Sequence, residues 1–556
     1  MEKLKPKLFS VMKSYSKEQF LKDVVSGIIV AIIALPLSIA LAIASGVSPE
    51  AGLYTAIVGG FIVSFMGGSR VQIGGPTGAF MVIVFGVVAQ YGIEGLIIAT
   101  IMAGVMMIAL GLLKMGAIIK FIPYPIITGF TSGIALVIFS SQINEFFGMN
   151  ITDLPTEFFE KWGSYFSNLS SINITTTLIG ILSVLIMVFW PKINKRIPGT
   201  LIALLVSSIL VAIFNLDVAT VGSKFGELSS SLPLPKIPHI TFDKIQLLIG
   251  PAIVIAFLGS IESLLCAVVS DGMIGSKHRS NMELVAQGTA NIGSALFGGI
   301  PVTGAIARTV ANIKNGGRTP IAGMVHSITL LIILVSLMPL VKLVPMASLS
   351  GVLFIVAYNM SQWREFKNLL KSPKSDVAVL LITFVLTVTI DLVIAIEVGM
   401  VLSMFLFMKR MSDVSDVSIK SLDFTEDSDN GSDDDFKVEN SKYPKLDKVL
   451  MYQINGPFFF GATFKYVEMI NQVDKDLEYL IIGMKHVPAM DASAIQSFRL
   501  SIESLRVHNI KLLITGIRQQ PLNALTKSNL VEVIGENNFY DTIEEAVGFI
   551  KTTRNQ

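Results

Sequence analysis

Long apolar stretches separated by short polar breaks fill roughly the first three quarters of the chain. A membrane-crossing helix needs roughly 20 apolar residues, so the pattern predicts about fourteen spans. The candidate spans are Asp23–Ser45, Ala51–Met66, Pro76–Gln90, Ile93–Leu113, Pro125–Phe147, Thr175–Trp190, Gly199–Phe214, Ile245–Val269, Leu284–Phe297, Val302–Ile313, Pro320–Leu340, Met346–Met360, Asp376–Ile390 and Leu392–Phe407. The segments that begin near Pro76 and Val302 are too short to cross alone, and each follows a glycine-rich sequence. We therefore expect an all-α membrane domain with two half-helices.

The pattern changes after Arg410. Residues 411–440 carry ten acidic residues and two lysines, which is typical of a disordered linker. Beyond it, strand-like runs alternate with helical stretches, and this order predicts a small α/β domain. The expected strands are Val449–Ile454, Tyr479–Met484 and Ile510–Thr515, and the expected helices are Thr463–Val473, Ala492–Val507 and Thr542–Thr552. The predicted organisation is an N-terminal segment 1–22, a transmembrane domain 23–410, an acidic linker 411–444 and a soluble domain 445–556.

Composition supports a membrane protein. Of the 556 residues, 52% are hydrophobic and only 15% are charged, whereas soluble domains carry about 25% charged residues. The net charge of +2 gives no reason to expect a nucleic-acid partner. An even number of spans puts both chain ends on one side, and that side carries basic clusters. They are the N-terminal lysines, Lys192/Lys195/Arg196, Lys277/Arg279 and Lys409/Arg410. The positive-inside rule makes it the cytoplasmic side of the cell (inner) membrane.

Two distant parts of the chain repeat the same motifs. Gly74-Gly-Pro-Thr-Gly-Ala79 resembles Gly299-Ile-Pro-Val-Thr-Gly-Ala305, and Thr77 and Thr303 are 226 positions apart. Lys120-Phe-Ile-Pro123 precedes Gly129 as Lys342-Leu-Val-Pro345 precedes Gly351, with an offset of 222 between the two lysines. Interrupted hydrophobic segments at matching places in two halves point to the binding site of a transporter. We therefore expect an internally duplicated transporter.

The two breaks have the chemistry of an anion site. A proline suits the first turn of a helix, and glycines let a ligand approach the backbone. The free N–H groups and the helix dipole attract anions without a lysine, and the hydroxyls of Thr77 and Thr303 add donors. The candidate substrate-binding residues are Pro76, Thr77, Gly78, Ala79, Val302, Thr303, Gly304, Ala305 and Arg308. The alternative is that both breaks are kinks that permit close helix packing.

Two charged residues lie within apolar segments. Arg308 follows Thr303 by five positions, as a fixed positive charge that adds to anion attraction or as a strut between helices. Glu262 is surrounded by apolar side chains, which favours the protonated form of a carboxyl. A proton on Glu262 and an anion nearby would then bind together, which is symport. The alternative is a buried glutamate hydrogen-bonded to neighbouring backbone. Position 36, the counterpart at the 226 offset, is a proline, so coupling is expected in one half only.

The remaining polar residues give weaker indications. One cysteine, Cys266, rules out an intrachain disulfide, and the five histidines lack metal-ligand spacing. No P-loop, His-Glu-x-x-His motif or nucleophile elbow occurs, so we expect no enzyme, no cofactor and no metal. Asp391 is expected to cap a turn between the last two spans, and Glu397 has no assigned role.

These motifs together resemble the sulfate permease (SulP) family of anion transporters, from about Phe20 to Phe549. The matching segments are Gly74-Gly-Pro-Thr-Gly78, Gly259-Ser-Ile-Glu-Ser-Leu-Leu265, Pro301-Val-Thr-Gly-Ala-Ile-Ala-Arg308, Asp391-Leu-Val-Ile-Ala-Ile-Glu-Val-Gly399 and a C-terminal domain similar to a STAS (sulfate transporter and anti-sigma antagonist) module. The resemblance implies a seven-plus-seven inverted repeat, a core domain moving against a gate domain, and dimerisation through the gate and STAS regions. It also implies an anion between Thr77–Ala79 and Val302–Ala305 and coupling at Glu262.

The resemblance also bears on the coupling ion and on regulation. Bicarbonate members carry an aspartate and, one turn on, a threonine as a sodium site, where this chain has Glu262 and Cys266. The surrounding run is most similar to proton-linked bacterial members, including a C4-dicarboxylate transporter. In the STAS domain, Ser493 aligns with a serine that relatives phosphorylate, but Asp491-Ala-Ser-Ala494 departs from their pattern. Asp491 as a plain helix N-cap is an equal alternative.

The expected function is secondary transport of a small inorganic anion or a C4-dicarboxylate, with proton symport and an elevator-like motion of the core domain. The alternatives are a sodium-coupled bicarbonate transporter, or an anion exchanger or channel on the same scaffold. A membrane-tethered sensor that signals through its STAS domain is a third class. Expected partners are the anion, a proton, the lipid bilayer, a second copy of the chain and a cytosolic protein at the STAS domain.

Overall fold

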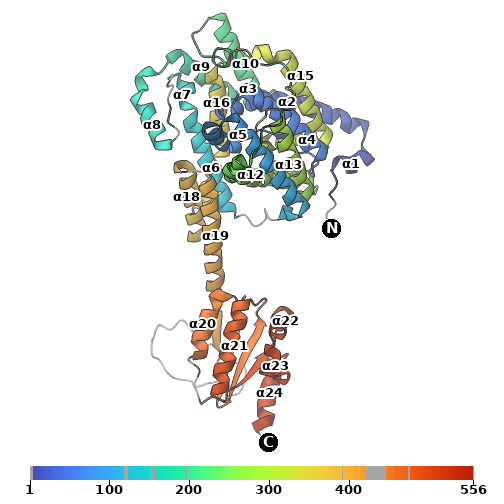
Figure 1. The fold of residues 1–556 in the computed structure, drawn as a ribbon, viewed down its shortest axis with the longest axis vertical. Helices are drawn as coiled ribbons and strands as arrows, with labels where there is room; N and C mark the ends of the chain where they lie inside the picture. Colours follow the sequence, from blue (N-terminus) through green and yellow to red (C-terminus); the bar gives the residue numbers. More distant parts are fainter. Residues whose placement is uncertain are drawn as a thin grey trace. The chain divides into compact units, whose positions relative to one another are not determined.

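The computed structural model describes residues 4–117, 123–149, 151, 154–155, 157–194, 197–390, 392–414, 416–420, 446–471, 473 and 476–554. They form two compact units, Met1–Val401 and Leu402–Gln556 (Figure 1). Lys120, Arg196, Asp391 and residues 421–444 of the expected acidic linker lie outside the described residues. The two units are described in turn.

The first unit is entirely helical apart from two very short strands. Its elements are α1 Leu8–Val11, a 3₁₀ turn Met12–Ser14, α2 Lys17–Ala44, α3 Pro49–Tyr54, a π-helical turn Thr55–Gly59, α4 Gly60–Met66, β1 Gly74–Gly75, α5 Gly78–Leu112, α6 Tyr124–Ser141, α7 Ile143–Phe147, α8 Phe158–Ser167, a 3₁₀ turn Leu169–Ser171, α9 Ile174–Ile193, α10 Gly199–Ile213, α11 Val221–Phe225, α12 Phe242–Ile274, α13 Ser280–Leu296, β2 Thr303–Gly304, α14 Ile306–Lys314, α15 Pro320–Val341, α16 Met346–Met360, α17 Trp363–Leu369, α18 Lys374–Thr389 and the start of α19 Leu392–Val414.

Every segment expected to span the membrane lies largely on a helix, and the last one, on α19, continues past Val401. The two spans expected at Pro76–Gln90 and Ile93–Leu113 form α5, which is interrupted at Gly92 by a φ of 69°. A side chain rarely adopts that conformation, so glycine permits the kink. Among the described residues, seven helical stretches are long and apolar enough to cross a membrane by themselves. The all-helical membrane fold predicted from the sequence is thus confirmed.

The helices pack in two groups. In one group α5 packs against α12 and α13, and α2 packs against α15; in the other α6 packs against α16 and α18, and α9 against α10 and α16. Small residues set the closest approach in the first group. A Cβ atom added to Gly104 of α5 would lie 2.6 Å from the carbonyl oxygen of Gly288 in α13. Small residues of this kind let helix backbones approach closely in membranes, so the first group is tightly packed where α5 meets α13.

The second unit is the expected α/β domain. Its remaining elements are β3 Asp416–Lys420, β4 Val449–Asn455, α20 Phe460–Asn471, β5 Tyr479–His486, α21 Ala492–Val507, β6 Lys511–Thr515, α22 Gln519–Lys527, α23 Leu530–Ile534, a 3₁₀ turn Glu536–Asn538, β7 Phe539–Tyr540 and α24 Ile543–Arg554. The five strands lie in the order β3-β4-β5-β6-β7, with β3 antiparallel to β4 and the other pairs parallel.

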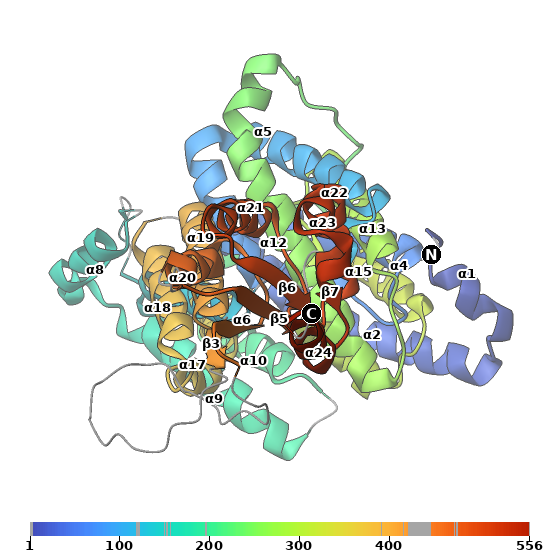
Figure 2. The same ribbon diagram turned by 90° about the horizontal axis from the view of Figure 1, so that it is seen from below.

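Alternation along the strands gives this sheet two buried faces. Leu480 and Ile482 pack in one apolar cluster with Tyr466 of α20 and Phe498 of α21, whereas Ile481 packs in another with Val547 of α24. Successive side chains of a strand point to opposite faces, so helices cover both sides (Figure 2). The sequence reading missed β3, which lies inside the expected linker and pairs with β4 from Asp416 to Lys420.

Candidate functional site

The two glycine-rich breaks lie side by side. β1 and β2 pair in antiparallel register, with Gly74 opposite Gly304 and Gly75 opposite Thr303. A Cβ atom on Gly75 would lie 2.1 Å from Arg308 Nη1, and one on Gly304 would lie 2.0 Å from Gln72 Nε2. Glycine is therefore required for this close approach. Residues 226 positions apart in the sequence thus form one site, from which α5 and α14 both begin.

At the first break, the N-terminal end of α5 has backbone amides that are free to donate a hydrogen bond. Thr77 is the N-cap residue of α5, and its side chain makes no cap hydrogen bond. Within the described part of the chain, the amides of Gly78 and Ala79 have no hydrogen-bond partner. A Cβ atom on Gly78 would lie 2.6 Å from Met360 Sδ at the end of α16. The donors of α5 therefore lie where the two groups of helices face each other.

The second break differs from expectation because the protein uses most of its donors. The amide of Val302 donates to Asn291 Oδ1 (3.0 Å), that of Gly304 to Ser263 Oγ (3.2 Å) and that of Ala305 to the carbonyl of Ile73 (2.9 Å). Ala305 is the N-cap of α14, and Ile306 and Ala307 in its first turn are exposed. Among the described residues, the amides of Ile306, Ala307 and Arg308 in the first turn of α14 have no hydrogen-bond partner, and all three lie beyond Ala305.

One helix, α12, contacts both breaks with adjacent residues. Thr77 Oγ1 donates to Glu262 Oε2 at 2.8 Å, and the hydroxyls of Ser263 and Thr303 are 2.7 Å apart. Glu262 and Thr77 are partly exposed, whereas Ser263 and Thr303 are buried. The Thr303 hydroxyl is therefore committed to α12 and is no free ligand donor. Sequence reasoning missed Ser263, although it follows Glu262 directly in the motif.

Arg308 lies behind the first break. Its side chain is 2% exposed, and Nη2 donates to the carbonyl of Pro76 (3.1 Å) and to Ser38 Oγ (3.3 Å). Nη1 has no hydrogen-bond partner, and no carboxylate among the described residues forms an ion pair with it. The guanidinium therefore ties α14 to α2 and to Pro76, which lies between β1 and α5. These contacts agree with the strut reading of Arg308, and attraction of an anion by its charge stays a prediction.

Two further buried polar side chains lie near this arginine. Neither ring nitrogen of His326 and neither amide atom of Gln72 has a hydrogen-bond partner within the residues described. His326 is fully buried and Gln72 is 4% exposed. Buried polar groups are normally hydrogen-bonded, to protein or to ordered water. Neither residue could be recognised from the sequence, because a lone His in the apolar helix α15 or a lone Gln in the loop before β1 has no diagnostic spacing.

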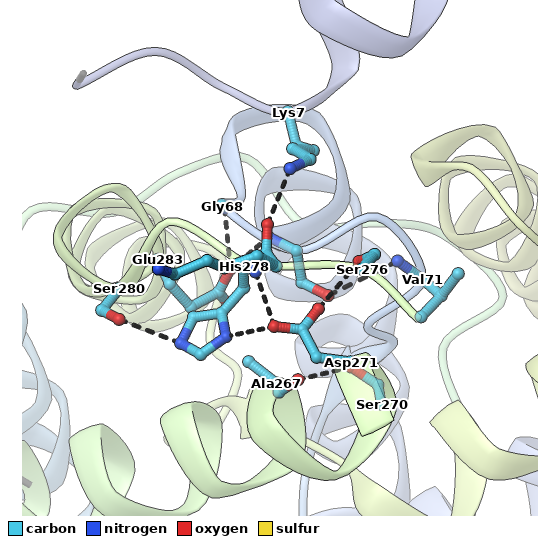
Figure 3. Close-up of polar contacts among 12 residues, drawn as sticks. Lys7, Gly68, Val71, Ala267, Ser270, Asp271, Ser276, His278, Ser280 and Glu283 are labelled. Atoms are coloured by element: carbon cyan, nitrogen blue, oxygen red, sulfur yellow. Dashed lines mark hydrogen bonds and ion pairs between the residues drawn. The ribbon is translucent and has the colours of Figure 1, made fainter. Parts of the chain in front are cut away.

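The other end of α12 is held by a chain of polar contacts (Figure 3). Asp271 Oδ2 lies 2.7 Å from His278 Nδ1, and Ser280 Oγ lies 2.9 Å from His278 Nε2. Lys7 donates to the carbonyl of Lys277 at 2.7 Å. The buried Glu283 accepts from the amide of Gly68 at 2.8 Å. These contacts fix the connection between α12 and α13 and tie the N-terminal segment to it.

The regulatory candidates lie at the start of α21. Asp491 is the N-cap of that helix, and its side chain accepts from the amide of Ala494 at 2.8 Å. A second hydrogen bond joins Asp491 Oδ2 to the amide of Phe460 at 3.2 Å. Ser493 is exposed beside it. The N-cap alternative therefore describes Asp491, and modification of Ser493 stays a prediction.

Comparisons with known proteins agree with this architecture. The sulfate permease family matches residues 20–383, and the STAS domain matches residues 440–546. A putative sulfate transporter of Bacillus subtilis, YvdB, is 41% identical over 544 residues, covering 96% of this chain and 99% of that protein. The bicarbonate transporter BicA of Picosynechococcus is 30% identical and covers 94% of both chains.

Two solved structures have similar folds. The structure of the murine anion transporter Slc26a9 in the inward-facing state aligns with a TM-score of 0.87 at 18% identity, over 99% of this chain and 94% of that one. The transmembrane domain of a cyanobacterial BicA aligns with a TM-score of 0.62 at 31% identity, over 70% of this chain and 98% of that one. The family match alone covers more than half of the sequence. The chain belongs to the sulfate permease family of anion transporters, with a C-terminal STAS domain.

Proposed function

We propose that the chain is a proton-coupled secondary transporter of a small anion, bound at the first turns of α5 and α14. The support for the anion site is the set of free amides at Gly78, Ala79, Ile306 and Ala307. The unneutralised charge of Arg308 lies beside it. Amide donors and a positive charge attract an anion, and a site without a direct ion pair can release it.

The hydrogen bond between Thr77 and Glu262 carries the coupling proposal. A threonine hydroxyl has one hydrogen to donate, and at 2.8 Å that hydrogen is directed to Glu262 Oε2. While Glu262 is a carboxylate, it occupies this donor and repels an anion nearby. Protonation of Glu262 removes the repulsion and frees the Thr77 hydroxyl to bind the substrate. Proton and anion binding therefore favour each other, which is the requirement for symport.

Sodium coupling is less consistent with the contacts of α12. Sodium prefers oxygen ligands, as other hard cations do, and the residue one turn beyond Glu262 is Cys266. Its Sγ is buried and lies 3.3 Å from Thr309 Oγ1 of α14. This side chain therefore offers no oxygen beside Glu262.

The proposal also covers the transport motion, the location of the STAS domain, the oligomeric state and the substrate. We infer that the group around α5, α12 and α13 slides against the group around α6, α9 and α16 in an elevator-like motion. The contact of Gly78 with Met360 supports a substrate position between the two groups. We also infer that the STAS domain lies in the cytoplasm and that the functional unit is a homodimer. One similar protein is named a putative sulfate transporter and another a bicarbonate transporter. Sulfate and bicarbonate are therefore candidate substrates here, together with a C4-dicarboxylate.

Transport by purified protein in lipid vesicles tests this function. The panel is sulfate, bicarbonate, chloride and succinate, each with and without a pH gradient and with and without a sodium gradient. We expect uptake of one anion class that is accelerated by an acidic exterior and is indifferent to sodium. Uptake driven only by a sodium gradient would show that the coupling ion is sodium and not the proton. Currents far above carrier turnover would make the protein a channel, and no flux of any anion would overturn transport.

A further inference from the structure

A large cavity leads from the surface toward the candidate anion site. It has a volume of about 820 Å³ and is lined by residues of α2, α5, α6, α8, α12, α16 and α18. Gln90 and Thr389 of its lining are exposed, whereas Met81 is buried one turn of α5 beyond Gly78. From Met81 to Gln90 a helix rises roughly 13 Å. The cavity therefore has the position of an access path to the first break.

A lysine with no partner lines this cavity. Lys161 of α8 is only 8% exposed, and in the part of the chain that the structure describes it forms no ion pair and no side-chain hydrogen bond. Lysines are almost never buried to this degree unless they are paired. Burial lowers the pKa of the Lys161 ammonium group below the usual value for lysine, with no carboxylate opposing the shift. Among the described residues, Lys161 is thus a buried amine without a counter-charge.

The position of Lys161 is fixed by its neighbours in α8. Trp162 Nε1 donates to Ser140 Oγ at 3.1 Å, and the hydroxyl of Tyr165 donates to the carbonyl of Ser140 at 2.8 Å. Ser140 belongs to α6 and also lines the cavity. Two hydrogen bonds therefore clamp α8 against α6 and hold Lys161 at the cavity wall.

The other charged groups of the cavity do not neutralise Lys161. Lys224 forms an ion pair with Glu145, so these two charges cancel each other. Glu157 is exposed and precedes Lys161 by one turn of α8, but it makes no ion pair with it. Of these four groups, Lys161 and Glu157 form no ion pair in the part of the chain that the structure describes, and Lys161 is the buried one of the two.

We propose that Lys161 is a capture site for the transported anion, which binds there before it reaches the first turn of α5. The ligand class is a small mono- or divalent anion, for which the lysine supplies a charge-assisted hydrogen bond. The proposal rests on the proposed transport function. It adds a second anion site on the access path. α8 lies between the fifth and sixth expected spans, so the cavity is expected to open on the side opposite the cytoplasmic basic clusters.

The side dependence gives a sharp test. Sulfate uptake is measured in intact cells, where the anion enters from outside, and in inside-out vesicles, where it enters from the cytoplasm. For Lys161→Gln we expect the KM of uptake into cells to rise about tenfold, as for the loss of one charge-assisted hydrogen bond. The maximal rate of uptake into cells stays unchanged. In inside-out vesicles Vmax/KM falls by the same factor, because the overall equilibrium fixes the ratio of Vmax/KM in the two directions, but there the loss lies in the maximal rate and the KM is unchanged. Lys161→Arg retains the charge and is expected to keep the wild-type KM.

The matched control is Lys236→Gln, which removes an exposed lysine ahead of α12 that is not part of the cavity lining. It is expected to behave as wild type. If Lys161→Gln leaves the KM in cells unchanged, the lysine merely reaches water through the cavity and the proposal is wrong. A drop in maximal rate in both directions, with unchanged KM, would assign Lys161 a structural role and would also overturn it.

A second measurement does not depend on transport. Purified protein in lipid is treated briefly with a small amine-acylating reagent, and modification of Lys161 and Lys236 is quantified by mass spectrometry. We expect sulfate, against gluconate at equal ionic strength, to slow acylation of Lys161 severalfold and to leave Lys236 unaffected. Protection without any transport would retain the anion site and refute the transport function. Transport without protection and with unchanged KM would refute the capture site alone.

Discussion

At the scale of single residues, the site is organised around the hydroxyl of Thr77. It donates to Glu262, while the neighbouring amides of Gly78 and Ala79 have no partner in the described part of the chain. The same threonine can therefore serve the carboxyl or the anion, but not both. In the proposed mechanism this exclusion links proton and substrate without a distant conformational signal.

Replacing Glu262 by glutamine tests that link. The amide cannot titrate, so Glu262→Gln is expected to abolish acceleration of uptake by an acidic exterior while anion binding persists. The measurement is initial uptake with and without a pH gradient, together with sulfate exchange at equal pH on both sides. Acid-stimulated uptake of wild-type size in this variant would contradict proton coupling at Glu262.

Gly78 tests the location of the substrate. A leucine there would fill the space in front of the free amides and displace Met360, so Gly78→Leu is expected to lose at least about 90% of uptake, since even small misplacement at a site is costly. Gly250→Leu is the control, because a Cβ atom at Gly250 would meet nothing within 4 Å. Normal transport by Gly78→Leu would place the substrate elsewhere. Gly304→Leu is a poorer test, because its side chain would collide with Gln72 and disturb folding.

At the scale of elements, the helices could be predicted from the sequence, whereas most contacts between distant segments could not. The expected spans all fall on helices because long apolar runs must hydrogen-bond internally in a membrane. The pairing of β1 with β2 could be anticipated only as a repeated motif, and the use of the Val302, Gly304 and Ala305 amides by Asn291, Ser263 and Ile73 could not. Those contacts join segments whose spacing in the sequence carries no signal. Helix α8, with Lys161, is too short and too polar to be recognised as a span.

The start of α21 provides an element-scale prediction. Asp491→Ala removes the N-cap hydrogen bond to Ala494 and is expected to lower the local stability of α21 by about 1 kcal/mol, the usual cost of losing a cap. Hydrogen exchange of the first amides of α21 in the full-length protein measures this change. Asp491→Asn is the control, because asparagine caps about as well. Unchanged exchange in the alanine variant would contradict the role of Asp491 as a cap.

At the scale of the whole molecule, the proposed transport site lies within the first unit. Glu262, both breaks and the cavity all belong to residues before Val401. We therefore expect a chain that ends after Val414, and so keeps α19 whole, to retain anion uptake at a reduced rate. The measurement is uptake per inserted molecule, with surface or membrane abundance quantified in parallel. Complete loss of uptake in a normally inserted truncation would favour a role of the STAS domain in the transport step itself.

The most direct test of the account is the position of a bound anion. Selenate is a close analogue of sulfate with a strong anomalous signal, and diffraction or a density map of the protein in its presence locates the selenium. The account predicts selenate within hydrogen-bond distance of the Gly78 and Ala79 amides, beside Thr77 and Glu262. Selenate bound only elsewhere in the membrane unit, with these amides still unoccupied at saturating concentration, would contradict it.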